Sequence, residues 1–259
     1  MKSRLLPPRL ILYLLMAILF SCQQRPAENP GSGESSTTSD IGEEEPAMSE
    51  EPALQIKDFI PPQWKTIRKV TGDLNKDGLA DVALVIQGTD RRKIHYDPDY
   101  QENVDENPRS LLLLFADPNS GGYELGIQKD NFIPIKELHH MEDPFGEMTI
   151  KKGVLKIKTG AMLSAGSWTN YFTDYVFRYQ DGYFALIGFD QSEFNRSSGE
   201  FTRTSVNLLT GDYFVETSNE TEEYNTPRKV RGKLRNTALP DLDTFSPGDE
   251  YEFIKSIPM

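Results

Sequence analysis

The chain has 259 residues, of which 37% are hydrophobic and 10% are aromatic. This apolar content excludes a fully disordered protein, and the length allows one large domain or two small ones. The formal net charge of −12 disfavours an extended phosphate-binding surface. Because the sequence also shows no basic stripe with interleaved aromatic residues, we expect no nucleic-acid partner.

The N-terminal segment predicts a secretory signal peptide over residues 1–21. Lys2, Arg4 and Arg9 give it a positive start, and residues 10–20 are continuously apolar. This apolar run is well short of the roughly 20 residues that a membrane-spanning helix needs. We therefore expect the segment to be removed on export.

The signal peptide is followed by Cys22, the only cysteine of the chain. The stretch LFSC resembles the lipobox of bacterial lipoproteins, whose cysteine is acylated, commonly with palmitate. Leu19 and Ser21 fit that pattern, whereas Phe20 is bulkier than the usual residue. The resemblance implies that Cys22 carries acyl chains that anchor the protein in a membrane of the bacterial cell envelope. Gln23 gives no strong retention signal, so the outer membrane is preferred, with its periplasmic or surface face left open.

Residues 22–52 predict a disordered acidic tether after the lipidated cysteine. They are rich in Pro, Gly, Ser, Thr and Glu and contain almost nothing apolar. Such a segment cannot bury enough surface to offset its ordering entropy. A flexible chain of about 30 residues spans about 30 Å on average, so we expect the tether to hold a folded domain off the membrane.

From residue 53 onward the hydrophobic residues recur mostly at every second position, which predicts β-strands. WKTIRKVTGD, ADVALVIQG and SLLLLFAD predict strands at 64–73, 80–88 and 110–117. Three hairpins are predicted further on, from turn residues between alternating segments. Their turns are Lys152-Gly153 in MTIKKGVLKIKTG, Asp181-Gly182 in YVFRYQDGYFALIGFD, and the region of Gly211 in TSVNLLTGDYFVETS.

Helical periodicity is poor, with weak candidates only near 53–59 and 136–142. Two long polar stretches that contain proline, 88–109 and 219–247, predict irregular loops. The expected fold is therefore a single mainly β domain over residues 53–259, an antiparallel sheet or β-sandwich-like domain with meander hairpins and few short helices. The pattern does not specify the strand order.

The stretch GDLNKDGLAD at 72–81 precedes an apolar strand and predicts a calcium site. Asp73, Asn75 and Asp77 alternate with other residues, so their oxygens can converge on one ion, and the glycine that follows permits the sharp turn. A cation would also offset the repulsion between the carboxylates. An EF-hand is excluded, because its twelfth position is Leu84, in a predicted strand, instead of a bidentate glutamate.

This stretch resembles the calcium loop of integrin-type FG-GAP and VCBS repeats, whose pattern is GDxNxDGxxD followed by an apolar strand. The resemblance implies Ca²⁺ bound by the side chains of Asp73, Asn75, Asp77 and Asp81 and the backbone oxygen of Leu79, in a closed structural site. The match occurs once, so a propeller of several blades does not follow. Otherwise the chain resembles uncharacterised secreted bacterial proteins with one such loop and an aromatic hairpin. The alternative is a hydrated Asp-Gly turn.

Other side chains give weaker signals for chemistry. His95, His139 and His140 lack the spacing of a metal site, so we interpret them as surface or loop residues. No nucleophile elbow or nucleotide-binding glycine loop occurs. The catalytic carboxylate pairs of glycoside hydrolases are defined by their separation in space, so sequence spacing does not identify them. Asp174, Asp190 and Glu193, which lie near aromatic residues, are the candidates.

Aromatic residues are concentrated in the predicted hairpin around residue 181. Most of them are expected in the core, since a face of tyrosine and phenylalanine is more often core than binding surface. Trp168, beside a flexible SAGS segment, and Tyr171, whose hydroxyl needs a partner, are the candidates for a ligand surface.

The leading interpretation is a non-enzymatic, calcium-stabilised binding or interaction module on a lipid-anchored envelope protein, with an envelope protein or a glycan as its partner. One alternative is an envelope hydrolase acting on glycan or peptide, which a deep pocket with facing acids would favour. Another is a purely structural lipoprotein, which a flat polar surface would favour.

Overall fold

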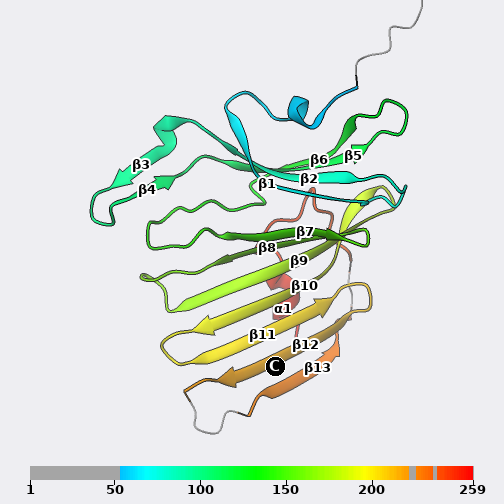
Figure 1. Cartoon of the computed structure of the whole chain (residues 1–259). Helices are drawn as coiled ribbons and strands as arrows, with labels where there is room; N and C mark the ends of the chain where they lie inside the picture. Colours follow the sequence, from blue (N-terminus) through cyan, green and yellow to red (C-terminus); the bar gives the residue numbers. More distant parts are fainter. Residues whose placement is uncertain (1–52, 222–225, 236–237, 259) are drawn as a thin grey trace, which may run out of the picture. The chain divides into compact units, whose positions relative to one another are not determined.

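Two antiparallel sheets form most of the molecule (Figure 1). The computed structural model describes residues 53–221, 226–235 and 238–258. The predicted signal peptide, Cys22 and the whole predicted tether lie outside these residues. The mainly β, antiparallel architecture predicted from the hydrophobic alternation is confirmed.

Within the described residues the larger sheet has seven strands in the order β13-β12-β11-β10-β9-β8-β7. Each strand pairs antiparallel with the next strand of the chain, so the sheet is a continuous meander. The strands are β7 (Phe145–Lys151), β8 (Val154–Ala161), β9 (Thr169–Gln180), β10 (Tyr183–Asn195), β11 (Glu200–Asn207), β12 (Asp212–Asn219) and β13 (Arg228–Lys233).

The three predicted hairpins are confirmed as β7–β8, β9–β10 and β11–β12. In the first two, both central residues have positive φ: 54° and 72° at Lys152 and Gly153, and 53° and 85° at Asp181 and Gly182. This conformation matches the right-handed twist of the flanking strands. The third turn contains Gly211, with a φ of 75°.

The smaller sheet has the order β1-β2-β5-β6 in the described part of the chain. The three strands predicted from apolar runs are confirmed as β1, β2 and β5. The fourth, β6, was not predicted, because its exposed and half-buried residues show no clear apolar alternation. The bounds are β1 (Trp64–Gly72), β2 (Asp81–Gly88), β5 (Arg109–Ala116) and β6 (Tyr123–Asp130).

The two sheets meet along β1 and β7 and share one hydrophobic core. A Cβ atom on Gly72 of β1 would lie 2.5 Å from Ile150 Cγ2 of β7, so glycine permits this close approach. Leu111 and Leu113 of the smaller sheet belong to the same buried cluster as Phe177 of the larger sheet. Burying each such side chain contributes about 1.5–3 kcal/mol, so this cluster holds the two sheets together.

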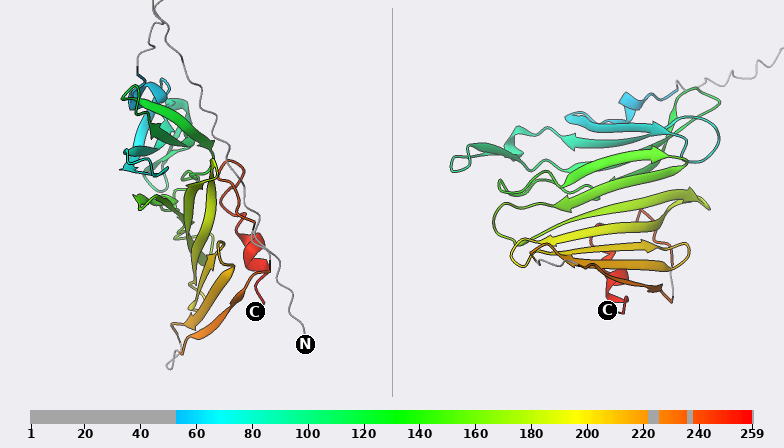
Figure 2. Two further views of the ribbon diagram at one scale, coloured as in Figure 1. Left: turned by 90° about the vertical axis from the view of Figure 1, so that its right-hand side faces the viewer. Right: turned by 60° about the horizontal axis from the view of Figure 1, so that its bottom comes forward.

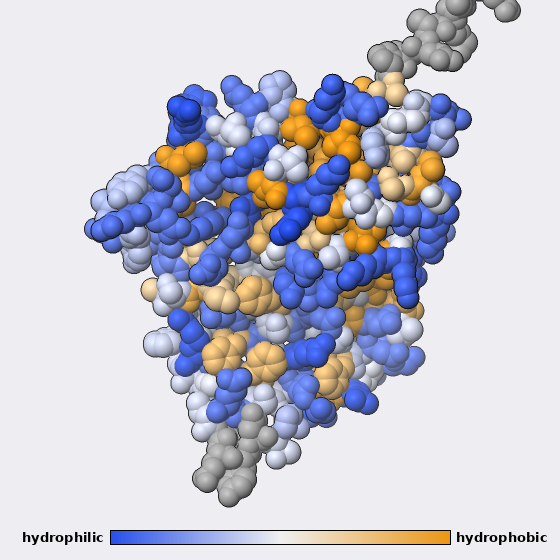
Figure 3. Space-filling view, in the orientation of Figure 1, coloured by the Kyte–Doolittle hydropathy of each residue, from blue (hydrophilic) through white to orange (hydrophobic). Residues whose placement is uncertain are grey.

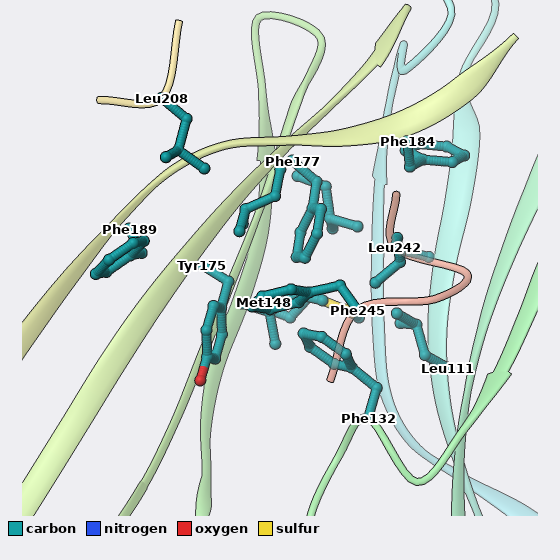
Figure 4. Close-up of a cluster of buried hydrophobic side chains, with 14 of the residues drawn as sticks. Leu111, Phe132, Met148, Tyr175, Phe177, Phe184, Phe189, Leu208, Leu242 and Phe245 are labelled. Atoms are coloured by element: carbon teal, nitrogen blue, oxygen red, sulfur yellow. The ribbon is translucent and has the colours of Figure 1, made fainter. Parts of the chain in front are cut away.

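Residues 238–258 cover one face of the larger sheet, which we call the inner face (Figure 2). Its inward-facing side chains include Tyr175 and Phe177 of β9, both buried. Phe132 and Phe245 pack edge-on against Tyr175, each with ring centroids 5.6 Å apart (Figure 4). Loop segments thus complete the core over the inner face, and the opposite side of the sheet is the outer face.

Strand β2 is buried along its whole length. One side faces the shared core, and Val82, Leu84 and Ile86 on the other side form a second cluster that packs under Ile56 and Phe59. A strand covered on both faces has no reason to alternate, which explains its continuous apolar run.

The helix predictions are only partly correct. The candidate at 53–59 contains η1 (Ile56–Phe59), a 3₁₀ helix. The candidate at 136–142 is wrong, since that segment contains turns and an isolated bridge. The helix α1 (Tyr251–Lys255) was not predicted, because five residues are too few for a helical period to show.

The two predicted irregular loops contain regular structure. The stretch 88–109 holds η2 (Arg91–Lys93) and a hairpin of β3 (Ile94–Asp97) and β4 (Glu102–Asp105), and the stretch 219–247 holds β13. These strands are short and mostly exposed. Backbone pairing alone defines them, so they leave no apolar pattern in the sequence.

Candidate functional site

The acidic loop between β1 and β2 is held by hydrogen bonds from its own backbone. Asp73 accepts from the N–H groups of Lys76 at 2.6 Å and Gly78 at 3.1 Å. Asn75 Oδ1 accepts from Asp77 N at 3.0 Å, and Asp77 Oδ1 accepts from Leu79 N at 2.7 Å. These Asx-type bonds curl the loop, and the φ of +89° at Gly78 requires glycine.

Asp81 has a different position from the other predicted ligands. It is fully buried. Its Oδ2 accepts from Leu74 N at 2.7 Å and Asn75 N at 3.3 Å, and its Oδ1 accepts from Ala116 N at 3.0 Å. Asp81 therefore fastens the loop to the end of β5, a structural role that the sequence spacing does not reveal.

The donor chemistry of the loop suits a hard cation. Asp73, Asn75 and Asp77 supply carboxylate and amide oxygens, which Ca²⁺ prefers, and each oxygen keeps a lone pair beside its bond to the backbone. In the described part of the chain, no three His, Cys, Asp or Glu side chains are grouped closely enough to hold a metal ion. The hydrogen bonds thus define the loop conformation, and calcium remains a prediction.

A pocket of about 620 Å³ lies elsewhere, on the inner face of the larger sheet. Its floor is formed by β8 to β12, and its walls are the segment around Pro144 and residues 247–257. Threonine hydroxyls line the floor, and Pro134, Met141, Val215, Ile254 and Ile257 add apolar surface. This volume lies in the usual range for small-molecule sites.

Glu250 belongs to the C-terminal wall, is 3% exposed, and bonds to residues of the floor. Its Oε1 accepts from Tyr175 Oη at 2.9 Å and from Thr173 Oγ1 at 3.4 Å, with Gln191 Nε2 at 3.5 Å. Its Oε2 accepts from Gly248 N at 2.7 Å. Burial, together with the charge and hydrogen bond of Glu250, raises the pKa of Tyr175, so Tyr175 remains a neutral donor.

The mouth of the pocket is lined by exposed tyrosine and glutamate side chains. Tyr171 and Tyr251 are 43% and 59% exposed. Glu193 lies directly opposite Tyr171 on β9 and Thr202 on β11, and Glu200 is two residues along from Thr202 on the same face. Burial, and then the charge of Glu250, raise the pKa of Tyr171.

The candidate surface residues are separated by the fold. Tyr171 lines the pocket, whereas Trp168 does not. Trp168 is 66% exposed, and Arg196 lies over its ring at 6.0 Å. The prediction that most aromatic residues of this hairpin are core is confirmed for Tyr175 and Phe177, which are 1% and 0% exposed.

The candidate carboxylates are also divided between the two faces of the sheet. Glu193 lines the pocket. Asp174 and Asp190 lie on the outer face, where Lys156 Nζ is 3.2 Å from Asp174 Oδ2 and Arg203 Nη2 is 3.8 Å from Asp190 Oδ1. Figure 3 shows this side of the molecule, with hydrophilic side chains among scattered hydrophobic ones.

Histidine lies outside this pocket. His95 is exposed on β3, and His139 and His140 lie in the segment before β7. His139 Nδ1 is 2.8 Å from Asp97 Oδ2, and its ring stacks on Tyr100 with centroids 3.7 Å apart. These contacts attach the β3–β4 hairpin to the rest of the domain, in agreement with surface and loop positions.

Sequence reasoning missed Glu200, Glu250 and Tyr251. They lie in polar stretches without a motif, and Glu250 lies 75 residues from its partner Tyr175. Only the cluster GDEYEF marks the C-terminal wall, and it carries no recognisable spacing.

No helix within the described residues is long and apolar enough to span a membrane. No protein-family model matches the chain, and no curated protein or solved structure is detectably similar to it.

Proposed function

We propose that the folded domain is a non-enzymatic binding module of the bacterial cell envelope, and that its ligand occupies the pocket on the inner face. The pocket itself carries this proposal. It combines 620 Å³ of space with apolar walls, exposed tyrosine rings and threonine hydroxyls. Mostly apolar pockets with a few convergent polar groups are the usual form of ligand sites.

The pocket favours binding over a purely structural role. A structural lipoprotein would need no concave site, whereas here the C-terminal segment roofs the sheet without filling the space above β10 and β11. Glu250 is engaged by four donors and so keeps the floor rigid. A rigid floor lowers the ordering cost of binding.

The proposal includes the membrane anchor and the calcium loop. Lipid on Cys22 and the tether would present the module at the envelope, with the outer membrane preferred, and Ca²⁺ would stiffen the β1–β2 loop. The support for the anchor is the lipobox resemblance, and the support for calcium is the oxygen-rich loop sequence with its Asx-type hydrogen bonds.

A second candidate function is a glycan hydrolase, which the placement of Glu193 and Glu200 favours. They are diagonal neighbours on paired strands and line the same pocket. The backbones of diagonal residues in an antiparallel pair are about 7–8 Å apart, so two flexible glutamate side chains can place their carboxyl groups at the separation of about 6.5–9.5 Å used by inverting glycosidases. Both side chains are exposed, however, and a general acid is usually found in a more desolvated place.

The test of binding uses two substitutions at adjacent positions of β12. Thr217 lines the pocket, whereas the side chain of Ser218 points to the outer face, so Thr217→Trp fills the pocket and Ser218→Trp is the matched control. Saturation-transfer NMR on the full-length chain in detergent would use muropeptides and chitotetraose as probes. We expect at least one probe to bind wild type and Ser218→Trp and to lose its signal with Thr217→Trp.

The same samples separate binding from hydrolysis. If the protein binds without cleaving, the muropeptide and chitotetraose spectra stay constant over a day. If wild type cleaves a probe and Glu193→Gln does not, the protein is a hydrolase and the non-enzymatic binding proposal is wrong. Signals that are identical in the two tryptophan variants would contradict the assignment of the pocket.

A further inference from the structure

The pocket on the inner face holds negative charge without a compensating positive side chain. Glu193, Glu200 and Glu250 line it, and none of its lining residues is lysine, arginine or histidine. Among the described residues, none of the three glutamates forms an ion pair. The average field inside the pocket is therefore negative.

Lys255 and Arg228 are close in sequence or in register to residues that line the pocket, but they do not line it. Lys255 Nζ is 2.7 Å from Glu252 Oε1 and 5.0 Å from the centre of the Tyr251 ring. Arg228 pairs in register with Thr217 and lines an adjoining cavity of about 50 Å³, which shares Val215, Thr217 and Ile257 with the pocket. Within the described residues, neither Lys255 nor Arg228 forms an ion pair with the three glutamates.

Glu250 contributes most to the field, because it is buried. All of its hydrogen-bond donors are neutral: two hydroxyls, a side-chain amide and a backbone N–H. They satisfy its oxygens without cancelling its charge. A charge beside apolar walls is weakly screened, so its attraction for a cation exceeds that of an exposed carboxylate.

Tyrosine rings add a second attraction for cations. Tyr171 and Tyr251 expose about half of their surface at the mouth. The face of an aromatic ring attracts an ammonium group by about 0.5–2 kcal/mol, depending on desolvation. The rings and the two glutamates at the mouth, with Glu250 deeper in the pocket, thus favour the same class of ligand.

We infer that the ligand of this pocket is a small organic amine in its ammonium form. This inference rests on the proposed function and narrows it. One ammonium group would lie among Glu193, Glu200 and the tyrosine rings, and the alkyl part would pack against the apolar side chains of Val215 and Ile254. A small dianion is repelled from the site and a small neutral molecule lacks the charge interaction, so both should bind more weakly than an ammonium ligand of the same length.

Three five-carbon probes of nearly equal size test this inference: cadaverine, which is a diamine, pentanediol, which is neutral, and glutarate, which is a dianion. Titration calorimetry of the full-length chain in detergent measures each. We expect cadaverine to bind at least tenfold more tightly than the other two, and we expect added salt to weaken it.

The double variant Glu193→Gln/Glu200→Gln removes two charges at the mouth and leaves the hydrogen bonds of Glu250 in place. Asp190→Asn/Glu216→Gln removes two charges from the outer face and is the control. We expect the pocket variant to lose cadaverine affinity at least tenfold and the control to match wild type. Melting curves of both verify folding.

Two outcomes would overturn the inference that the pocket binds an amine, and they differ in whether the pocket remains a binding site. If pentanediol binds as tightly as cadaverine and Thr217→Trp abolishes both, the pocket binds ligands but does not select amines. If cadaverine binds equally to wild type, Glu193→Gln/Glu200→Gln and Thr217→Trp, the amine binds elsewhere. The muropeptide and chitotetraose experiment then decides the proposed function separately.

Discussion

Arg109 is a charged residue at the start of β5 whose side chain is only 6% exposed. Its guanidinium donates to both oxygens of Asp143, at 2.7 and 2.8 Å, and to the carbonyl oxygen of Pro134 at 2.9 Å. This fork–fork pair joins the smaller sheet to the segment before β7. Because Arg109 is buried, loss of Asp143 would leave its charge uncompensated.

The pair predicts an acid dependence of stability. Burial raises the pKa of Asp143, but hydrogen bonds from Arg109 and the Phe145 N–H, with the charge of Arg109, outweigh it, so the pKa of Asp143 lies below 3.8. A carboxyl group whose pKa is lowered by folding stabilises the protein above its unfolded pKa, and this contribution is lost as pH falls through the folded pKa. The free-energy difference between wild type and Asp143→Asn should therefore be constant above about pH 5 and shrink below about pH 4.

Urea unfolding at a series of pH values measures this difference. Glu142→Gln is the control, because Glu142 is the neighbouring carboxyl group and makes no ion pair with the described residues. If the difference in free energy of unfolding between wild type and Asp143→Asn stays unchanged down to pH 2, the charge of Asp143 is not what stabilises Arg109.

At the scale of the element, the β1–β2 loop combines two kinds of acidic residue. Asp73 and Asp77 accept hydrogen bonds only from within the loop, from its backbone N–H groups and, for Asp77, also from the Asn75 side-chain amide at 2.9 Å. Asp81 is buried and bonds to the end of another strand. The first group can serve a cation, whereas Asp81 supports the loop with or without one.

A calcium titration distinguishes these roles in the full-length chain in detergent. For a site with a Kd of about 10⁻⁴ M, about 10 mM Ca²⁺ should stabilise the fold by about 2.7 kcal/mol. We expect wild type to show the corresponding rise in Tm and Asp77→Ala to show none. Asp81→Ala should lower stability by about 2–4 kcal/mol even in a chelator, because three backbone N–H groups lose their acceptor.

Magnesium at the same concentration is the ionic-strength control for this titration. If calcium leaves the Tm of wild type unchanged, the calcium prediction is wrong and the loop is only a hydrogen-bonded Asx turn. An equal rise in wild type and Asp77→Ala would place the calcium elsewhere on this acidic chain.

At the scale of the whole molecule, the proposed attachment to a membrane depends on Cys22, which lies outside the described residues. No described helix can span a membrane. The proposed attachment rests on the lipobox resemblance at Cys22 and is covalent lipid, whose buried methylene groups would supply the affinity.

Substitution Cys22→Ser tests this attachment in a bacterial host. We expect wild type to incorporate labelled palmitate and to partition into the detergent phase, and we expect the variant to lose the label and move to the aqueous phase. Ser35→Ala, in the same predicted tether, is the control. A Cys22→Ser protein that stays in the detergent phase would contradict the lipid anchor.

The sequence by itself determined the strands and turns whose signals are local. Asp181-Gly182 and Lys152-Gly153 adopt positive φ at both positions, and the glycine of each pair, flanked by alternating segments, allowed the hairpins to be predicted from a few residues. The run at 82–86 also predicted a buried strand from local sequence, because five consecutive apolar residues are stable only when both faces of the strand are buried. β3, β4 and β13 lack such a pattern, since backbone pairing on exposed edges leaves side chains free to vary.

Only the tertiary structure decided the composition of the pocket. Glu250 meets Tyr175 across 75 residues of sequence, and Glu193 joins Glu200 because β10 and β11 are paired in one register. The same sheet turns Asp174 and Asp190 to the outer face, away from Glu193. Side chains alternate between the faces of a strand, and contacts between distant segments have no local signature. The acidic loop was recognisable from the sequence, whereas the charged pocket required the folded sheet.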